Sequence, residues 1–349
     1  MANKSLSIHT YFFIPMLLMF FLITSGHHFA FSTKQQLTGP HIQIWIYGLT
    51  AIFFLVLITL IRYYSLHQIC FAFYLISPLV IGFSIPFITW FPAIYDLIIT
   101  FWIGGSFFFF WAYANNHFSF RQAGLYYPLF IIISVASQIF KPQIPFNLVL
   151  TGILMTICAV AIFLLFLFTF FRLKWILHEE DCRGPGIDEM FEIIYRVIIG
   201  GLIFSLVLLM VLNQQFMAIE TLWRVVILCF LPILSVLLFS FQGTSWRFTA
   251  YGILFTVIVT YWSGLSLIQL LTPLVLLLKE MSFIAVPKCS RFLTKTWVDL
   301  FFTGCGLGAG HLLLFAPNPV GLIAIIVAMA TYAITTHLAG VRLETFTSK

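Results

Sequence analysis

The stretch Arg172–Glu192 reads RLKWILHEEDCRGPGIDEMFE and is the one long polar segment in a chain of 349 residues. It mixes both charge signs, and the run Gly184-Pro185-Gly186 at its centre disfavours a continuous helix. The chain on either side is strongly apolar, since 62% of all residues are hydrophobic and only 8% are charged. The stretch therefore predicts a polar linker between two apolar halves.

Six apolar runs precede this linker and six follow it. A helix rises about 1.5 Å per residue, so roughly 20 apolar residues cross a hydrocarbon core of about 30 Å. The runs are unbroken and do not alternate with a period of two, which favours helices over a β-barrel. We therefore predict an all-α polytopic membrane protein with twelve transmembrane helices. The predicted spans are Thr10–Phe31, Ile42–Ile61, His67–Ile88, Pro92–Ala114, Leu125–Phe140, Phe146–Phe171, Ile193–Leu212, Trp223–Phe241, Phe248–Trp262, Leu265–Val286, Trp297–Phe315 and Val320–Leu338.

Lysine and arginine gather in every second gap between these spans. Thirteen of the seventeen fall on one side, namely Lys4, Arg62, Arg121, Arg172, Lys174, Arg183, Arg196, Arg247, Lys288, Arg291, Lys295, Arg342 and Lys349. Only Lys34, Lys141 and Arg224 fall on the other side, and Lys279 lies within a span. The positive-inside rule predicts that both termini and the linker are cytoplasmic. The net charge of +6 then reflects topology, and no exposed basic stripe indicates nucleic-acid binding.

The first apolar run could instead belong to a signal peptide, because Lys4 precedes it. Ser25-Gly26-His27-His28 is a poor cleavage site, so we expect a retained first span.

A cytoplasmic linker between two six-helix bundles is the layout of major facilitators, whose halves surround a site at the bilayer midplane. The expected domains are residues 1–171, the linker 172–192 and residues 193–349.

Ionisable side chains within the spans are the candidate functional residues, because burying a charge in lipid is costly. Asp96 near the outer end of the fourth span is either an interfacial residue or a pathway residue. Lys279 and Glu280 interrupt the tenth span; snorkelling would explain the lysine, whereas the glutamate needs a partner. Adjacent helix positions point about 100° apart, so these two need not pair with each other. Lys295 and Asp299 lie four apart, a spacing that brings side chains together on one helix face.

No catalytic triad, P-loop or metal-ligand cluster is recognisable in the sequence, so we expect neither an enzyme nor a metal or cofactor. Gly304, Gly306, Gly308 and Gly310 superficially suggest a dinucleotide-binding fingerprint. They lie within a span with no preceding strand, which favours close packing of helices instead.

Several motifs resemble those of the nucleotide transporters, the ATP/ADP translocases of plastids and of obligate intracellular bacteria. In the first half, Phe110–Asn115, Arg121–Ala123 and Tyr127–Phe130 resemble the segment that follows the fourth helix of that family. In the second half, Lys279–Ile284 resembles its lysine-glutamate-methionine-alanine-tyrosine-isoleucine block, and Lys295–Asp299 resembles its lysine-alanine-alanine-isoleucine-aspartate run. The motifs occur in matching order in the two halves, and the resemblance between them is weak.

This resemblance implies a carrier in a bacterial plasma membrane or a plastid-type inner membrane, with no obligate protein partner. Thr33-Lys34 and Leu37 resemble the family's first-loop motif, which implies that Lys34 attracts phosphate from outside and Lys295 from inside. The resemblance also implies carboxylates that adjust the charge of the cavity or serve as exchange partners for the lysines, namely Asp96, Glu280 and Asp299. Lys279 would line the same pathway. Asn115 and Arg121 would brace the cytoplasmic gate.

The departures from the family pattern put nucleotide exchange in doubt. The family's arginine and aspartate ahead of the first-loop lysine fall on Phe31 and Ser32, and its polar and basic positions ahead of the second block fall on Leu270–Leu274. Phosphate binding relies on Arg and Lys donors, so the loss of several donors weakens the case for a nucleotide triphosphate.

Three functional hypotheses follow from the sequence. The first is an alternating-access carrier, such as an antiporter, that binds a nucleotide or a similar small anionic metabolite. The second is a facilitator-type permease for a less charged solute, for which Asp96 or Glu280 would be the groups that couple transport to protons. The third is a non-transporting membrane scaffold in which the 42 phenylalanines plug the cavity.

Overall fold

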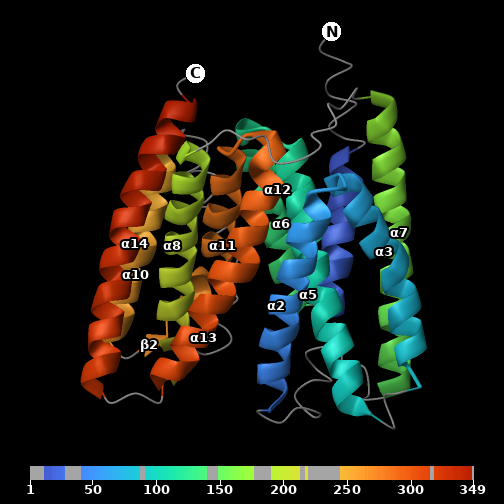
Figure 1. Ribbon diagram of the computed structural model, residues 1–349, viewed down its shortest axis with the longest axis horizontal. Helices are drawn as coiled ribbons and strands as arrows, with labels where there is room; N and C mark the ends of the chain where they lie inside the picture. Colours follow the sequence, from blue (N-terminus) through green and yellow to red (C-terminus); the bar gives the residue numbers. More distant parts are fainter. Residues whose placement is uncertain are drawn as a thin grey trace. The chain divides into compact units, whose positions relative to one another are not determined.

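The computed structural model of the protein is helical throughout nearly all of the residues that it describes (Figure 1). Those residues are 12–27, 41–86, 91–139, 148–176, 190–212, 217–218, 244–263, 265–266, 268–314 and 318–347. The predicted span Trp223–Phe241 and the candidate residue Lys34 lie outside them. Every other predicted span coincides largely with a helix.

The helices of the first half are one over Phe12–His27, α2 (His41–Ile61), α3 (Leu66–Ser84), α5 (Pro92–His117), α6 (Phe120–Ile139) and α7 (Leu148–Ile176). Those of the second half are α8 (Met190–Leu212), α10 (Thr244–Ser263), α11 (Ile268–Ile284), α12 (Lys288–Thr296), the π-helical segment η2 (Trp297–Phe302), α13 (Thr303–Leu314) and α14 (Asn318–Thr347). Two short strands, β1 (Met217–Ala218) and β2 (Leu265–Ser266), pair in parallel with Met217 opposite Leu265.

Six helices in the described part of the chain are long and apolar enough to cross a membrane. They cover Leu66–Ser84, Leu97–His117, Val149–Phe171, Ile193–Leu212, Ser290–Leu314 and Pro319–Leu343. Shorter apolar helices cover Phe12–His27, Leu49–Ile61, Gln122–Ser134 and Thr249–Val259. The protein is therefore an integral membrane protein built from helices, and the count of twelve spans stays a prediction.

Helix α3 illustrates why lipid is the solvent. Its buried face includes Tyr74 and Ile81, whereas Leu79 and Phe83 on the opposite side are 57% and 76% exposed. A helix that is apolar on both its buried and its exposed faces belongs in a membrane. Ser65 and Gln68 form a capping box at its start, which supplies partners for backbone N–H groups at the helix end.

The chain divides into two compact units, Met1–Ala114 with Ile133–Gly184, and Asn115–Ile132 with Pro185–Lys349. The main boundary, between Gly184 and Pro185, lies within the linker predicted from the sequence. The short segment Asn115–Ile132 was expected in the first bundle but groups with the second unit. Its first residue explains this, because the Asn115 side chain and carbonyl both hydrogen-bond to residues of the second unit.

Within the first unit, α3 packs against α7 and α2. The Tyr74 hydroxyl donates to the Ser106 carbonyl at 3.2 Å, and the Tyr74 ring lies 5.1 Å from that of Phe166. Gly105 permits the Phe73 ring to approach, since a Cβ there would lie 2.6 Å from Phe73 Cζ. Aromatic rings and a small residue thus allow close contact between these helices, as expected where packing rather than water expulsion holds helices together.

Within the second unit, α8 is central and contacts α11, η2, α13 and α14, while α10 contacts α11 and α14. The close contact of α8 with α13 depends on two of the four glycines noted in the sequence. A Cβ at Gly306 would lie 3.0 Å from the Phe204 carbonyl oxygen, and one at Gly310 would lie 2.7 Å from Val211 Cβ. Gly304 and Gly308 have open space beside them, so the packing prediction is confirmed for Gly306 and Gly310 only.

We predict that Gly310→Ala destabilises the protein whereas Gly308→Ala does not. The new methyl group of Gly310→Ala must push α8 and α13 apart, at a cost of about 1–3 kcal/mol, whereas the methyl of Gly308→Ala meets no atom within 4 Å. Thermal unfolding of the purified variants in detergent measures the difference. Equal unfolding midpoints for the two variants would contradict the packing role of Gly310.

Candidate functional site

Four ionisable side chains of the second unit form one connected cluster, which we call the charge network: Lys279, Glu280, Lys295 and Asp299. Lys279 and Glu280 lie near the end of α11, Lys295 lies in α12, and Asp299 lies in η2. Since α12, η2 and α13 run on without a break, the network lies between two helical segments that the chain connects by a short turn. Each lysine contacts both carboxylates.

The pair Lys295–Glu280 is the inner part of the charge network. Lys295 Nζ lies 2.9 Å from Glu280 Oε1 and 2.7 Å from Oε2, and these side chains are 1% and 0% exposed. Asn115 Nδ2 donates to the same Glu280 Oε2 at 2.7 Å, and the ammonium also lies 4.6 Å from the centre of the Phe283 ring. Charge-assisted hydrogen bonds of this kind are short and directional, so they fix the geometry of the pair.

The pair Lys279–Asp299 is the outer part of the charge network. Lys279 Nζ lies 3.0 Å from Asp299 Oδ1 and 3.1 Å from Glu280 Oε1, and the Lys279 and Asp299 side chains are 19% and 10% exposed. Asp299 Oδ2 also lies 2.6 Å from Lys295 Nζ. The outer pair is therefore partly accessible at the surface of the helices, and the inner pair is enclosed.

The π-helical segment η2 places Asp299. Hydrogen bonds in such segments span five residues instead of the four of an α-helix, and the segments occur frequently at functional sites. Here the Thr303 backbone N–H bonds to the Val298 carbonyl five residues earlier, and the Thr303 hydroxyl donates to the same carbonyl at 3.1 Å. This widened turn directly follows Lys295 and still keeps Asp299 in contact with it.

Asn115, Tyr127 and Arg291 form a second group of contacts, the Asn115 junction, that adjoins the charge network. The Tyr127 hydroxyl donates to Asn115 Oδ1 at 2.6 Å, so both ends of the Asn115 amide are bonded. The Arg291 guanidinium donates to the Asn115 carbonyl and to the carbonyls of Ile284 and Val286, at 2.8 Å from Nη2 to Ile284 and 2.9 Å from Nη2 to Val286. These carbonyls are at helix ends, where intrahelical donors are lacking.

The charges of the network cancel, because two lysines face two carboxylates. Arg291 is also buried, but its partners are neutral carbonyls. A neutral network avoids most of the cost of holding ions in a medium of low dielectric constant. Its lysines can still bind an anion if a carboxylate moves away, so the arrangement is suited to exchange of ion-pair partners.

The structure brings together Asn115, Lys279, Glu280, Lys295 and Asp299 from the residues selected by sequence. Asp96 lies in α5 and Arg121 lies in α6, but their side chains are outside the described part of the structure, as is all of Lys34. The neighbours Lys279 and Glu280 need not pair from adjacent helix positions, but here Lys279 Nζ lies 3.1 Å from Glu280 Oε1.

Two residues of the site were not selected from the sequence. The sequence marks Tyr127 only as part of a family motif, and the predicted spans place Arg291 and Lys295 in a loop. In the structure Arg291 and Lys295 lie in α12 and are buried, at 7% and 1% exposed. The candidate membrane-spanning segment that contains them begins at Ser290, earlier than the predicted start at Trp297. The spacing contains the signal, since Arg291, Lys295 and Asp299 follow one another at intervals of four.

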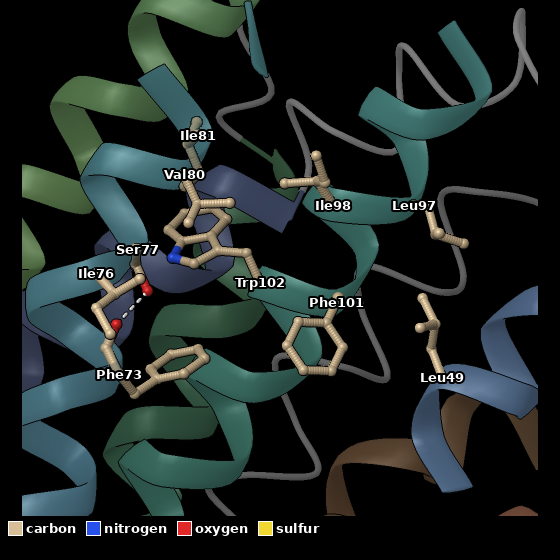
Figure 2. Close-up of a pocket in the computed structure, with 10 residues that line it drawn as sticks. All are labelled: Leu49, Phe73, Ile76, Ser77, Val80, Ile81, Leu97, Ile98, Phe101 and Trp102. Atoms are coloured by element: carbon tan, nitrogen blue, oxygen red, sulfur yellow. Dashed lines mark hydrogen bonds between the residues drawn. The ribbon is translucent and has the colours of Figure 1, made fainter. Parts of the chain in front are cut away.

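A separate cavity of about 300 Å³ lies within the first unit, between α2, α3 and α5 (Figure 2). Its lining is apolar apart from Ser77 and Trp102, and the Ser77 hydroxyl already donates to the Phe73 carbonyl at 2.6 Å. No charged side chain lines it among the described residues, so it does not suit an anionic solute.

Comparison with known proteins identifies no relative: no family model matches this chain, and no curated protein matches it.

We predict that breaking the inner pair is strongly destabilising. Lys295→Met leaves Glu280 buried without its main cation, which typically costs about 3–5 kcal/mol. The double variant Lys295→Met with Glu280→Gln should lose less than the sum of the two single losses, because no charge is left unpaired.

Unfolding in detergent measures these losses, and Lys288→Met is the matched control, because Lys288 is exposed at the start of the same helix. Additive losses in the double variant would show that Lys295 and Glu280 do not stabilise each other.

Proposed function

We propose that this protein is a secondary transporter that moves a small anionic metabolite, such as a nucleotide, by alternating access. The buried charge network carries the proposal. Ionisable groups in membrane helices are costly, and in transporters they mark substrate and ion pathways. The resemblance of Lys279–Ile284 and Lys295–Asp299 to nucleotide transporter motifs adds support, since both motifs contribute to the same network.

The lysines of the network are the proposed anion-binding groups. An ammonium binds phosphate or carboxylate as a point charge, and Lys279 is the more exposed of the two. An anionic group entering from water would replace Asp299 at Lys279 before it reached Lys295. The carboxylates then act as the resting partners of the lysines in the absence of substrate.

The Asn115 junction is the proposed gate on the cytoplasmic side. It ties the end of α5 to the turn between α11 and α12 through Arg291, and it contacts the network through Asn115 and Glu280. Because Asn115 bonds directly to Glu280, a rearrangement of the network on substrate binding would disturb the junction. This connection supplies the link between binding and opening that alternating access requires.

The second candidate is a permease for a less charged solute. The zero net charge of the network favours this permease. A nucleotide triphosphate carries about four negative charges, which is more than two lysines can neutralise. Both candidates use the same groups, and they differ in which solute moves.

We expect reconstituted protein to take up radiolabelled ATP or ADP into liposomes, and we expect Lys279→Met and Lys295→Met to abolish that uptake. Removing either ammonium removes a donor for the anionic group and leaves a carboxylate without its cation. Initial uptake rates, measured with counter-substrate inside the liposomes, provide the readout. Lys288→Met is again the control and should transport at the wild-type rate.

Each result of this assay discriminates between the candidates. Uptake of amino acids or other solutes of low charge without uptake of ATP or ADP would favour the permease. An inserted, folded protein that moves none of these solutes would favour the scaffold. Full activity of Lys295→Met would remove the role assigned to that lysine.

A further inference from the structure

Glu280 and Asp299 both contact Lys295, so the charge of the network depends on which cations remain beside these two carboxylates. Lys295 Nζ lies 2.7 Å from Glu280 Oε2 and 2.6 Å from Asp299 Oδ2. The second cation of the network, Lys279, contacts the same two carboxylates. The network is neutral only while both lysines remain within it.

Binding of an anion at Lys279 removes one of these two cations from the carboxylates. Glu280 and Asp299 would then share Lys295 alone, and the site would hold one excess negative charge in a membrane-spanning segment. Two carboxylates that share a site with too little positive charge bind a proton between them. The alternative, an uncompensated buried charge, is far more costly.

The proton would reside on Asp299 rather than on Glu280. Glu280 is 0% exposed, accepts from Lys295 at each of its two carboxylate oxygens and also accepts from Asn115, so it has three hydrogen bonds. Asp299 is 10% exposed and would retain a single contact with Lys295. Asp299 is therefore the more accessible of the two carboxylates and has fewer partners than Glu280.

Other charged groups near η2 have partners of their own. On α12, Arg291 donates to backbone carbonyls, and on α8, Arg196 Nε donates to Thr294 Oγ1 at 3.4 Å. On α13, His311 Nδ1 lies 2.8 Å from the Leu307 carbonyl, and on α8 the Tyr195 hydroxyl donates to the Ser282 carbonyl. The network lysines are thus the cations that contact Asp299 among the described residues.

We infer that the anionic substrate crosses the membrane together with one proton. Asp299 takes up this proton when the substrate displaces the Asp299 carboxylate from Lys279. The inference rests on the proposed transport function. A proton from the entry side bonds to an Asp299 carboxylate oxygen while the anionic group pairs with Lys279 Nζ, and on the far side the proton and the anion both leave. Coupling to one proton allows a pH gradient of one unit to support about a tenfold accumulation of the anion.

The first test needs no substrate, because Lys279→Met removes the same cation that the substrate would occupy. We expect infrared difference spectra of the Lys279→Met protein at neutral pH to show one protonated carboxyl group that is absent from wild type and from Lys288→Met. Labelling aspartate carboxyl groups with 13C should shift the band of this group to lower frequency, whereas labelling glutamate should leave it in place. The absence of the band from folded Lys279→Met, or a shift with labelled glutamate and not with labelled aspartate, would overturn the assignment.

The second test uses wild-type protein and stays informative if Lys279→Met does not fold. ATP is added outside proteoliposomes that contain a pH-sensitive dye, at equal pH on both sides. We expect ATP entry to acidify the lumen, and we expect Asp299→Asn to lose the acidification. Entry of ATP without acidification would overturn the inference and leave the proposed function intact. A lack of ATP entry would count against nucleotide transport, and the infrared result would then decide the proton site on its own.

Discussion

The second unit depends on one electrostatic constraint: each ionised group that the membrane helices bury needs either an opposite charge or several hydrogen bonds, and Arg291 has only the second. Lys295 and Glu280 meet this constraint through two short contacts and the Asn115 amide, and Lys279 and Asp299 complete the balance. Because each lysine contacts both carboxylates, no pair can separate without affecting the others. Low dielectric surroundings strengthen every contact and penalise every unpaired charge, so the four side chains act as one unit.

This constraint also accounts for features of the backbone around the network. The widened turn of η2 presents Asp299 beside Lys295, and Arg291 satisfies carbonyls where α11 ends and where α5 approaches its end. The segment that begins at Asn115 groups with the second unit for the same reason, since the Asn115 amide supplies a donor that Glu280 requires. Polar contacts thus determine local structure at the few places where the apolar helices would otherwise have no specific register.

The sequence predicted the helices well and the site in part. Continuous apolar runs set where helices form, so the predicted spans coincide with helices wherever the structure describes them. Intervals of four residues identified Lys295 with Asp299, but the bridge from Lys295 to Glu280 joins two helices and has no sequence period. The prediction that Arg291 lies in a loop was wrong, because a charged residue beside an apolar run is typical of the end of a span. Arg291 is buried instead, and its hydrogen bonds to backbone carbonyls, which the sequence does not reveal, make that burial favourable.

A neutral network and a fixed pocket of cations would differ, as anion-binding sites within a membrane, in what they cost when no anion is bound. A pocket of unpaired lysines would repel itself and would be costly to maintain when empty. In the network, the carboxylates neutralise the lysines at rest, so under the proposed function an entering anion would have to compete with Asp299 for Lys279. That competition would lower the affinity for the anion, but it would make binding conditional on a rearrangement of charge. Since Glu280 bonds to Asn115 and Asn115 bonds to Arg291, the same rearrangement reaches the turn between α11 and α12. Binding that required no exchange of partners would leave this turn undisturbed, and it could not drive a conformational change.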